Sequence, residues 1–402
     1  MIGGKKMKYD FTTVPNREGH GSGKWAMMRE KKPDVSKGVI PFSVADMELK
    51  NSPEVVEGLK KFLDEVVLGY SSPTKAYYDS VISWMKRRHN FDVKAEWIQV
   101  TAGIVPAFFN AIRVFSNKGD GVIVMSPVYH PFYFAIEENK RTRVDCPLKL
   151  DKDNYYTIDF DLLDELASKE ENKILLFCSP HNPVGRVWKK EELERVAEIV
   201  LKHDLLLISD EIHHDLIMPG YKHTVFQTLS EELADRTITC TATSKSFNLA
   251  GMSLSNIIIK NPKIKERFIA GLNEVKGIPI SSLSFKACEI AYNESEGWFD
   301  ELLKLIDTNQ RLVHDYLKEH HPEIKARLIE GTYLQWLDFR ALNMTNEELD
   351  KFLEQKCELF FNSGYIFGDN GSGFMRWNLA CPTSLIQEGL ERLTKGLNKI
   401  KA

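Results

Sequence analysis

The sequence lacks the features that mark membrane-spanning, secreted and nucleic-acid-binding proteins. No stretch approaches the roughly 20 consecutive apolar residues of a transmembrane helix, and the first residues lack the apolar segment of a secretory leader. The 53 basic residues are interspersed with 57 acidic ones, so no basic stripe is present for a nucleic acid. We therefore expect no membrane partner, no nucleic-acid partner and a cytoplasmic location.

Cysteine is scarce, and its spacing excludes a disulfide framework. The six cysteines are far apart and form no Cys-x-x-Cys pair, which is typical of buried thiols in a reducing compartment. They are Cys146, Cys178, Cys240, Cys288, Cys357 and Cys381.

Two common site types are missing as well. A P-loop needs Gly-x-x-x-x-Gly-Lys-Ser/Thr, but the near match at 18–25 begins with glutamate and ends with tryptophan. A metal site formed by Asp210, His213 and His214 is disfavoured, because adjacent histidines rarely face one ligand and no His-Glu-x-x-His occurs. We therefore expect no metal.

The chain does contain a regular alternation of short apolar runs and amphipathic stretches. The spacing at 53–66 and at 191–203 predicts helices. The run at 205–209 is apolar throughout, as expected of a strand buried on both faces. The full set of predicted strands is 97–101, 121–125, 173–178, 205–209, 237–241 and 256–259. This alternation predicts an α/β domain built on a largely parallel sheet.

The pattern changes after about residue 285. A long helical stretch at 298–320 leads into short segments that predict a smaller α+β domain. These segments are 327–329, 333–338, a helix near 345–356, a strand at 374–379 and a closing helix. We therefore divide the chain into an N-terminal arm with part of the small domain (1–50), a large domain (51–285) and a small C-terminal domain (286–402).

The most informative stretch is Thr-Ala-Thr-Ser-Lys-Ser-Phe-Asn-Leu-Ala-Gly at 241–251. It places Lys245 in a small, hydroxyl-rich turn directly after an apolar run. A lysine that forms a Schiff base needs a fixed position, partial desolvation and a nearby anion site for a cofactor phosphate. An ordinary turn lysine explains the stretch equally well, so the hypothesis depends on finding its partners.

Candidate partners follow the predicted strands, where ligands bind in open α/β sheets. Gly103 precedes a helix whose free amides suit a phosphate, although simple turn geometry also explains it. Tyr129 lies between two prolines and suits stacking on a flat ring, or plain packing. Asn182, before Pro183, suits donation to a phenolate or carboxylate oxygen, or capping of a turn.

Two charged residues in apolar strands complete the set. Asp210 ends a buried strand, where a carboxylate needs a partner. With the magnesium and metal alternatives disfavoured, a protonated ring nitrogen of a cofactor remains. Arg376 lies within the apolar strand at 374–379 and matches a carboxylate bidentately, unless it forms a structural pair with an acid.

Taken in chain order, these motifs resemble the class I/II aminotransferases, which are pyridoxal-phosphate enzymes of fold type I. The resemblance spans about residues 30–400 and implies a large domain with a mainly parallel seven-stranded sheet. It implies that Lys245 forms the Schiff base and moves protons, that Asp210 binds the ring nitrogen, and that Tyr129 stacks on the ring. It further implies that Asn182 binds the ring hydroxyl oxygen and borders the substrate carboxylate site.

The same resemblance assigns the remaining positions. Gly103, Ile104 and Ser244 are expected to bind the cofactor phosphate, and Arg376 the substrate α-carboxylate. Tyr70 looks like the tyrosine that reaches the phosphate of a neighbouring subunit, which implies a homodimer with composite sites. The expected substrate is a small amino acid.

Two departures from the family pattern point to one branch. Most members have a tyrosine three residues after the aspartate, where this chain has His213, which we count among the cofactor-binding residues. Most have a phosphate-binding arginine eight residues after the lysine, where this chain has Ser253. Together with four further motifs, these departures look like the cystathionine β-lyase branch. The motifs are 44–47 (Val-Ala-Asp-Met), 210–213 (Asp-Glu-Ile-His), 244–251 and 331–338.

The resemblance leaves three functions open. The favoured one is a C–S β-lyase that cleaves L-cystathionine or cysteine S-conjugates to a thiol, pyruvate and ammonia. The second is an aminotransferase, which shares every step up to the carbanion. The third is a lyase with an added regulatory interaction, as members of this branch are known to have.

Overall fold

The computed structural model describes residues 7–276 and 278–401. The α-helices are α1 (Gly23–Lys31), α2 (Pro53–Glu65), α3 (Lys75–His89), α4 (Ile104–Phe115), α5 (Pro131–Glu138), α6 (Phe160–Ala167), α7 (Lys190–Lys202), α8 (Glu231–Ala234), α9 (Thr243–Ser246), α10 (Pro262–Glu274), α11 (Ser282–Glu294), α12 (Glu296–His320), α13 (Asn346–Lys351) and α14 (Thr383–Lys401). The strands are β1 (Ile98–Thr101), β2 (Gly121–Val124), β3 (Thr142–Asp145), β4 (Lys149–Leu150), β5 (Tyr156–Thr157), β6 (Asn172–Cys178), β7 (Leu206–Asp210), β8 (Thr237–Thr241), β9 (Ser255–Ile259), β10 (Lys325–Ala326), β11 (Leu334–Asp338), β12 (Asn362–Ser363) and β13 (Phe374–Asn378).

The large sheet has seven strands in the order β1-β9-β8-β7-β6-β2-β3. Only β9 runs antiparallel to its neighbours, so the prediction of a mainly parallel seven-stranded sheet is confirmed. Successive residues of β6 alternate between two buried cores, with Leu175 and Phe177 in one and Ile174 and Leu176 in the other. Because both faces are covered, the strands read as continuous apolar runs.

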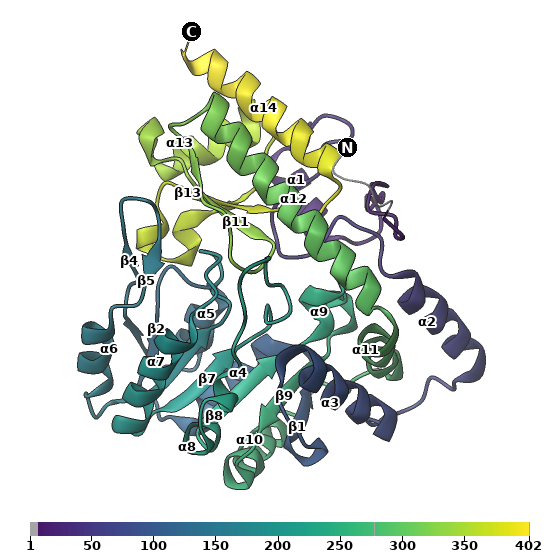
Figure 1. Ribbon diagram of the computed structural model, residues 1–402, viewed down its shortest axis with the longest axis vertical. Helices are drawn as coiled ribbons and strands as arrows, with labels where there is room; N and C mark the ends of the chain where they lie inside the picture. Colours follow the sequence, from purple (N-terminus) through teal and green to yellow (C-terminus); the bar gives the residue numbers. More distant parts are fainter. Residues whose placement is uncertain (1–6, 277, 402) are drawn as a thin grey trace.

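The smaller sheet lies in the C-terminal part of the chain. Its strands pair antiparallel in the order β10-β11-β13-β12, and the long helices α12 and α14 pack together beside it (Figure 1). Residues 327–329 follow β10 and form no strand. The helix predicted near 345–356 is α13 followed by one π-helical turn at Phe352–Lys356. The N-terminal arm, for which no helix was predicted, contains α1.

The register of the large sheet sets the position of the site. Cys178, Asp210 and Cys240 are paired neighbours at the carboxyl ends of β6, β7 and β8. The segments that follow these strands therefore open at one edge of the sheet and carry Asn182, Asp210 and Lys245 to it.

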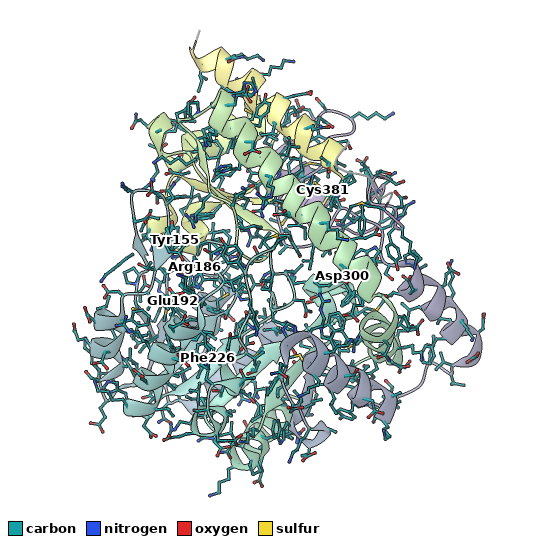
Figure 2. The ribbon with its side chains drawn as sticks, in the orientation of Figure 1. Tyr155, Arg186, Glu192, Phe226, Asp300 and Cys381 are labelled. Atoms are coloured by element: carbon teal, nitrogen blue, oxygen red, sulfur yellow. The ribbon has the colours of Figure 1, made fainter. Side chains whose placement is uncertain are left out.

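A buried arginine ties the two sheets together. Arg186 Nε donates to Glu330 Oε2 over 2.9 Å, and its NH2 donates to Glu192 Oε2 over 2.6 Å. Its guanidinium also lies 4.3 Å from the centre of the Tyr155 ring (Figure 2). Because the amides of Glu330 and Gly331 both donate to the Gly185 carbonyl, the segment before β11 is held against the loop between β6 and α7.

No helix in the described ranges is long and apolar enough to cross a membrane.

Candidate active site

One cavity of about 540 Å³ brings the predicted site residues together at the carboxyl edge of the large sheet. Its lining includes all of them except Tyr70, namely Gly103, Ile104, Tyr129, Asn182, Asp210, His213, Ser244, Lys245 and Arg376. A cavity of this size holds a cofactor together with a small substrate. Tyr70 is instead fully exposed on the loop between α2 and α3.

The Lys245 amine points into this cavity from the short helix α9. Its Nζ donates to the carbonyl oxygen of Ala45 over 2.7 Å, and Tyr333 Oη donates to the same oxygen over 2.8 Å. Burial lowers the pKa of Lys245 to about 8, although the charge of Asp46 opposes this shift. The neutral, nucleophilic form of the amine is therefore much more populated near physiological pH than in an exposed lysine.

Asp210 presents a buried carboxyl group without a basic partner. Its Oδ1 accepts the Ile212 amide over 3.1 Å, and no ion pair joins it to a cation among the described residues. Burial raises the pKa of Asp210 to about 7, while the Ile212 amide and the charge of Lys245 act in the opposite direction. A cation placed against this carboxyl group would stabilise its charged form.

Arg376 is buried and, within residues 7–276 and 278–401, likewise has no oppositely charged partner. Its NH1 donates to Asn182 Oδ1 over 2.8 Å and its NH2 to Asn362 Oδ1 over 2.7 Å. Both acceptors are neutral amides, and Nε is buried without a hydrogen bond to any described residue. Burial lowers the pKa of Arg376 to about 10. The structure therefore does not support the alternative in which Arg376 forms a structural ion pair with an acidic residue.

The end of the cavity near α4 offers backbone amides and hydroxyl groups. Gly103 precedes the helix with φ +115°, a conformation that favours glycine, and the first-turn amides of Ile104 and Val105 have no partner within the helix. Ser244 and Ser253 line the same cavity. The amides and hydroxyl groups together suit an anion at the helix N-terminus.

Two aromatic rings border the cavity between these ends. Burial and the charge of Asp210 raise the pKa of Tyr129 to about 12, so its phenol stays protonated. Burial and the charge of Lys245 hold the pKa of His213 well below its usual value, so its imidazole is neutral. The His213 ring packs edge-on against Tyr333, and its buried Nδ1 has no partner among the described residues.

His213 lines the cavity, whereas His214 lies in a different buried group. His214 lies with His89 and Asp215 in a buried group whose ligand-type atoms are within 4.8 Å of one another. Asp215 accepts bonds from His89 Nε2, Trp84 Nε1 and Ser246 Oγ, so its carboxylate is already satisfied by side chains. These bonds support α9 from below the cavity.

Several residues of the cavity were not predicted from sequence. Val44 and Ala45 belong to the motif at 44–47, but nothing in that motif indicates that they contact Lys245 or line the site. Asn362 belongs to a strand of two residues, which has no recognisable period in sequence. His130 follows Tyr129 directly in the sequence but was not predicted as a site residue. Its ring borders the cavity, and its buried Nδ1 has no partner among the described residues.

Comparison with known proteins agrees with this geometry. The family model "Aminotransferase class I and II" matches residues 37–393. The chain belongs to this family. The resemblance inferred from the motifs is thus confirmed, and the fold is that expected of fold type I.

Individual relatives cover nearly the whole chain. Cystathionine beta-lyase PatB of Bacillus subtilis (strain 168) is 37% identical over 359 residues, which cover 89% of this chain and 92% of that protein. Among solved structures, cystalysin from Treponema denticola, described as containing a pyridoxal 5'-phosphate cofactor, has a TM-score of 0.97 with 57% identity and covers 98% of this chain and 100% of its own. The PLP-bound C-S lyase from Staphylococcus hominis has a TM-score of 0.90 with 30% identity, covering 98% of this chain and 100% of its own.

Proposed function

We propose that the protein is a pyridoxal-phosphate-dependent C–S β-lyase that cleaves L-cystathionine or cysteine S-conjugates to a thiol, pyruvate and ammonia. The observation that carries the proposal is one cavity in which three buried groups converge. They are a lysine amine with a lowered pKa, and a carboxyl group and a guanidinium that have no ion-pair partner among the described residues. The named activities of PatB, of the Staphylococcus hominis C-S lyase and of other relatives support it.

The residues present fit this cofactor. Asp210 would hold the ring nitrogen in its protonated form, and Tyr129 would cover one face of the ring. Asn182 and His213 would border the ring, while Gly103, Ile104 and Ser244 would hold the phosphate at the N-terminus of α4. When bound, the cofactor supplies an electron-accepting ring that stabilises negative charge at the substrate Cα.

The protein's own groups then divide the chemistry. Arg376, with Asn182 beside it, would bind the substrate carboxylate and so orient the Cα–H bond. Lys245 would hold the cofactor through its amine, and the same amine would accept the Cα proton of the substrate. A pKa near 8 suits that amine to both accepting and returning a proton.

We also propose that the protein is a homodimer whose sites are completed by Tyr70 of a second copy. Tyr70 is fully exposed, Val67 and Leu68 on the same loop are largely exposed, and Ile278 is exposed elsewhere. Large apolar side chains left in water on one loop favour burial against another subunit. We further propose the division into 1–50, 51–285 and 286–402 and a cytoplasmic location, which suits the six buried free cysteines.

The alternative activity is transamination, because Lys245, Asp210 and Arg376 serve both reactions. The deciding experiment supplies purified holoenzyme with L-cystathionine alone, and separately with an amino acid plus 2-oxoglutarate. We expect pyruvate and thiol from the first mixture without any need for a keto acid. Amino transfer in the second mixture with no thiol in the first would replace the lyase by an aminotransferase.

A matched test of the site uses Lys245→Ala beside Lys169→Ala, an exposed lysine far along the chain. Borohydride should fix the cofactor covalently to the peptide that contains Lys245 in the wild type and in the control. The Lys245→Ala protein should stay unlabelled and inactive. Labelling at another lysine would refute the assignment.

A further inference from the structure

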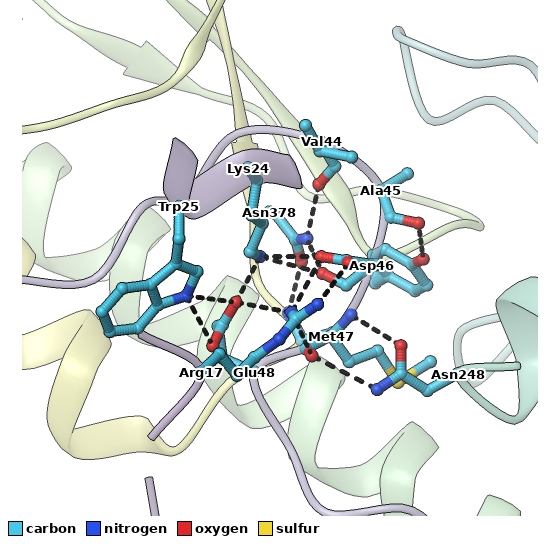
Figure 3. A network of polar contacts seen from close by, with 12 residues as sticks. Arg17, Lys24, Trp25, Val44, Ala45, Asp46, Met47, Glu48, Asn248 and Asn378 are labelled. Atoms are coloured by element: carbon cyan, nitrogen blue, oxygen red, sulfur yellow. Dashed lines mark hydrogen bonds and ion pairs between the residues drawn. The ribbon is translucent and has the colours of Figure 1, made fainter. Parts of the chain in front are cut away.

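One segment of the N-terminal arm contacts the surroundings of both Arg376 and Lys245. This arm segment (Val44–Asp46) lies across the cavity from the large sheet, and Figure 3 shows its bonds to the small domain and to the rest of the arm. Its Val44 N–H donates to Asn362 Oδ1 over 2.8 Å, the same oxygen that accepts Arg376 NH2. Its Ala45 carbonyl accepts Lys245 Nζ over 2.7 Å.

The position of Asn362 explains how one oxygen serves two donors. Asn362 is paired directly across from Arg376 in the antiparallel register of β12 and β13. Its side chain therefore lies beside the guanidinium, and its Oδ1 reaches outward to the arm segment. Because this oxygen accepts the Val44 amide, its loss would leave that amide without its partner.

The remaining bonds of the arm segment fix its backbone in an unusual shape. Asn378 Nδ2 donates to the carbonyls of Val44 over 2.8 Å and of Asp46 over 2.6 Å. Asp46 is also paired with Arg17 and with the buried Lys24 (Figure 3). Val44 adopts φ +57°, which a β-branched residue enters only when its surroundings hold it there.

We propose that Asn362 is a positioning residue that couples Arg376 to the arm segment, so that a carboxylate bound at Arg376 holds the segment closed over Lys245. The identity of that carboxylate as an amino acid rests on the proposed function. The coupling itself rests on the shared acceptor. By reciprocity, closure of the segment then strengthens carboxylate binding at Arg376 by the same factor.

The coupling also assigns a task to the Ala45 carbonyl. In the holoenzyme of the proposed function, the Lys245 amine would be free while a substrate occupies the site, and that substrate carries the carboxylate. A closed arm segment presents the Ala45 oxygen to the freed amine at that stage. The amine is thereby held near the substrate and the Tyr333 hydroxyl instead of turning into the solvent.

The first test follows amide hydrogen exchange in the cofactor-free protein. We expect Asn362→Ala to speed exchange of the Val44 amide roughly fivefold or more, as for loss of one protecting hydrogen bond. Asn362→Asp keeps an acceptor and should retain the protection. Ser363→Ala is the matched control, since Ser363 is the neighbouring residue of β12 and its hydroxyl donates to Asp350 instead.

The second test adds a carboxylate to the holoenzyme. 2-Methylalanine carries the amine and the carboxylate but no Cα proton, so it binds without turnover. In the wild type and in Ser363→Ala it should slow exchange across 42–48. In Asn362→Ala it should still shift the absorbance of the bound cofactor but leave that exchange unchanged.

The outcomes are distinct. Equal Val44 exchange in the wild type and in Asn362→Ala would overturn the proposal, as would a ligand effect that survives in Asn362→Ala. If Asn362→Ala is unstable, Asn362→Leu keeps the side-chain volume and gives the same comparison. A protein that fails to bind the cofactor would refute the proposed function, while the first test would still decide the link between Asn362 and the arm segment.

Discussion

At the scale of single residues, the site concentrates ionisable side chains in surroundings that disfavour their charges. Asp210 and Lys245 are both buried and shifted toward their neutral forms, to pKa values of about 7 and about 8. Such groups destabilise the cofactor-free fold, and their retention is explained by chemistry rather than by folding.

Asp210 gives a prediction about pH. A carboxyl group whose pKa is raised on folding destabilises the fold as the pH rises through the interval between its unfolded and folded values, here from about 4 to about 7. An asparagine side chain at this position cannot ionise, so Asp210→Asn should stabilise the cofactor-free protein at pH 8 by about 2–4 kcal/mol. At pH 4.5 the gain should fall to about 1 kcal/mol, because most of the interval between the two pKa values lies above that pH.

Urea unfolding at the two pH values measures this difference. Asp153→Asn is the control, because Asp153 is exposed. The holoenzyme of Asp210→Asn should lose most lyase activity in spite of its greater stability. A gain that is equal at both pH values would show that charge is not its cause.

Individual site residues could be predicted from sequence where a charged side chain stands in an apolar stretch that does not suit a charge. An aspartate that ends an apolar strand and an arginine within one both signal a missing partner, and both line the cavity. Asn362 and Val44 carry no such conflict, since an asparagine in a short polar stretch and a valine anywhere are unremarkable in sequence. Their importance comes from bonds across more than 300 positions of chain.

At the scale of elements, α9 is too short to hold Lys245 by its own hydrogen bonds. Its support comes from Asp215, which accepts Ser246 Oγ over 2.6 Å, Trp84 Nε1 over 2.9 Å and His89 Nε2 over 2.6 Å. Burial alone would raise the pKa of Asp215, but His214 and His89 beside it hold that pKa well below its usual range.

Asp215→Ala should therefore destabilise the protein by about 3 kcal/mol or more, because it leaves several buried donors without an acceptor. Chemical denaturation measures the change. Asp215→Asn keeps one carbonyl acceptor, so its free energy of unfolding should fall clearly less than that of Asp215→Ala. Equal losses in the two variants would mean that the hydrogen bonds to this side chain contribute little.

Elements were predicted well where an apolar run or a period of 3.6 residues is sustained. Six strands of the large sheet have such runs and the helices α7, α12 and α14 have such a period, whereas β3, whose residues are mostly exposed, was missed. Helix α1 was missed because it is short and has no apolar face of the expected width, with Trp25 and Met28 buried but Met27 exposed. The segment at 327–329 is apolar in part yet continues past β10 without pairing.

At the scale of the whole molecule, the position of Tyr70 predicts that two copies share each site. A mixture of Lys245→Ala and Tyr70→Ala proteins, each nearly inactive, should regain activity after their subunits exchange. Random exchange of subunits in a two-fold dimer gives roughly one quarter of wild-type activity, because half the dimers are mixed and each has one intact site.

Activity before and after mixing, together with mass measured in solution, checks this expectation. Mixing Lys245→Ala with Asp210→Asn is the control. Both residues of a given site come from the same subunit, so no combination of the two proteins contains an intact site. Absence of recovery in the first mixture, with dimers present, would place Tyr70 outside the site.

The ion pair between Arg186 and Glu330 has a consequence for how small molecules enter and leave the cavity. Because this contact holds the two sheets together, we expect the cavity to open by a movement of the arm segment (Val44–Asp46) away from the site. We do not expect the two sheets to rotate relative to each other. A covalent cross-link between the segments that carry Arg186 and Glu330 would then leave turnover unchanged. A cross-link that fixes the arm segment in place would instead keep a bound molecule in the cavity.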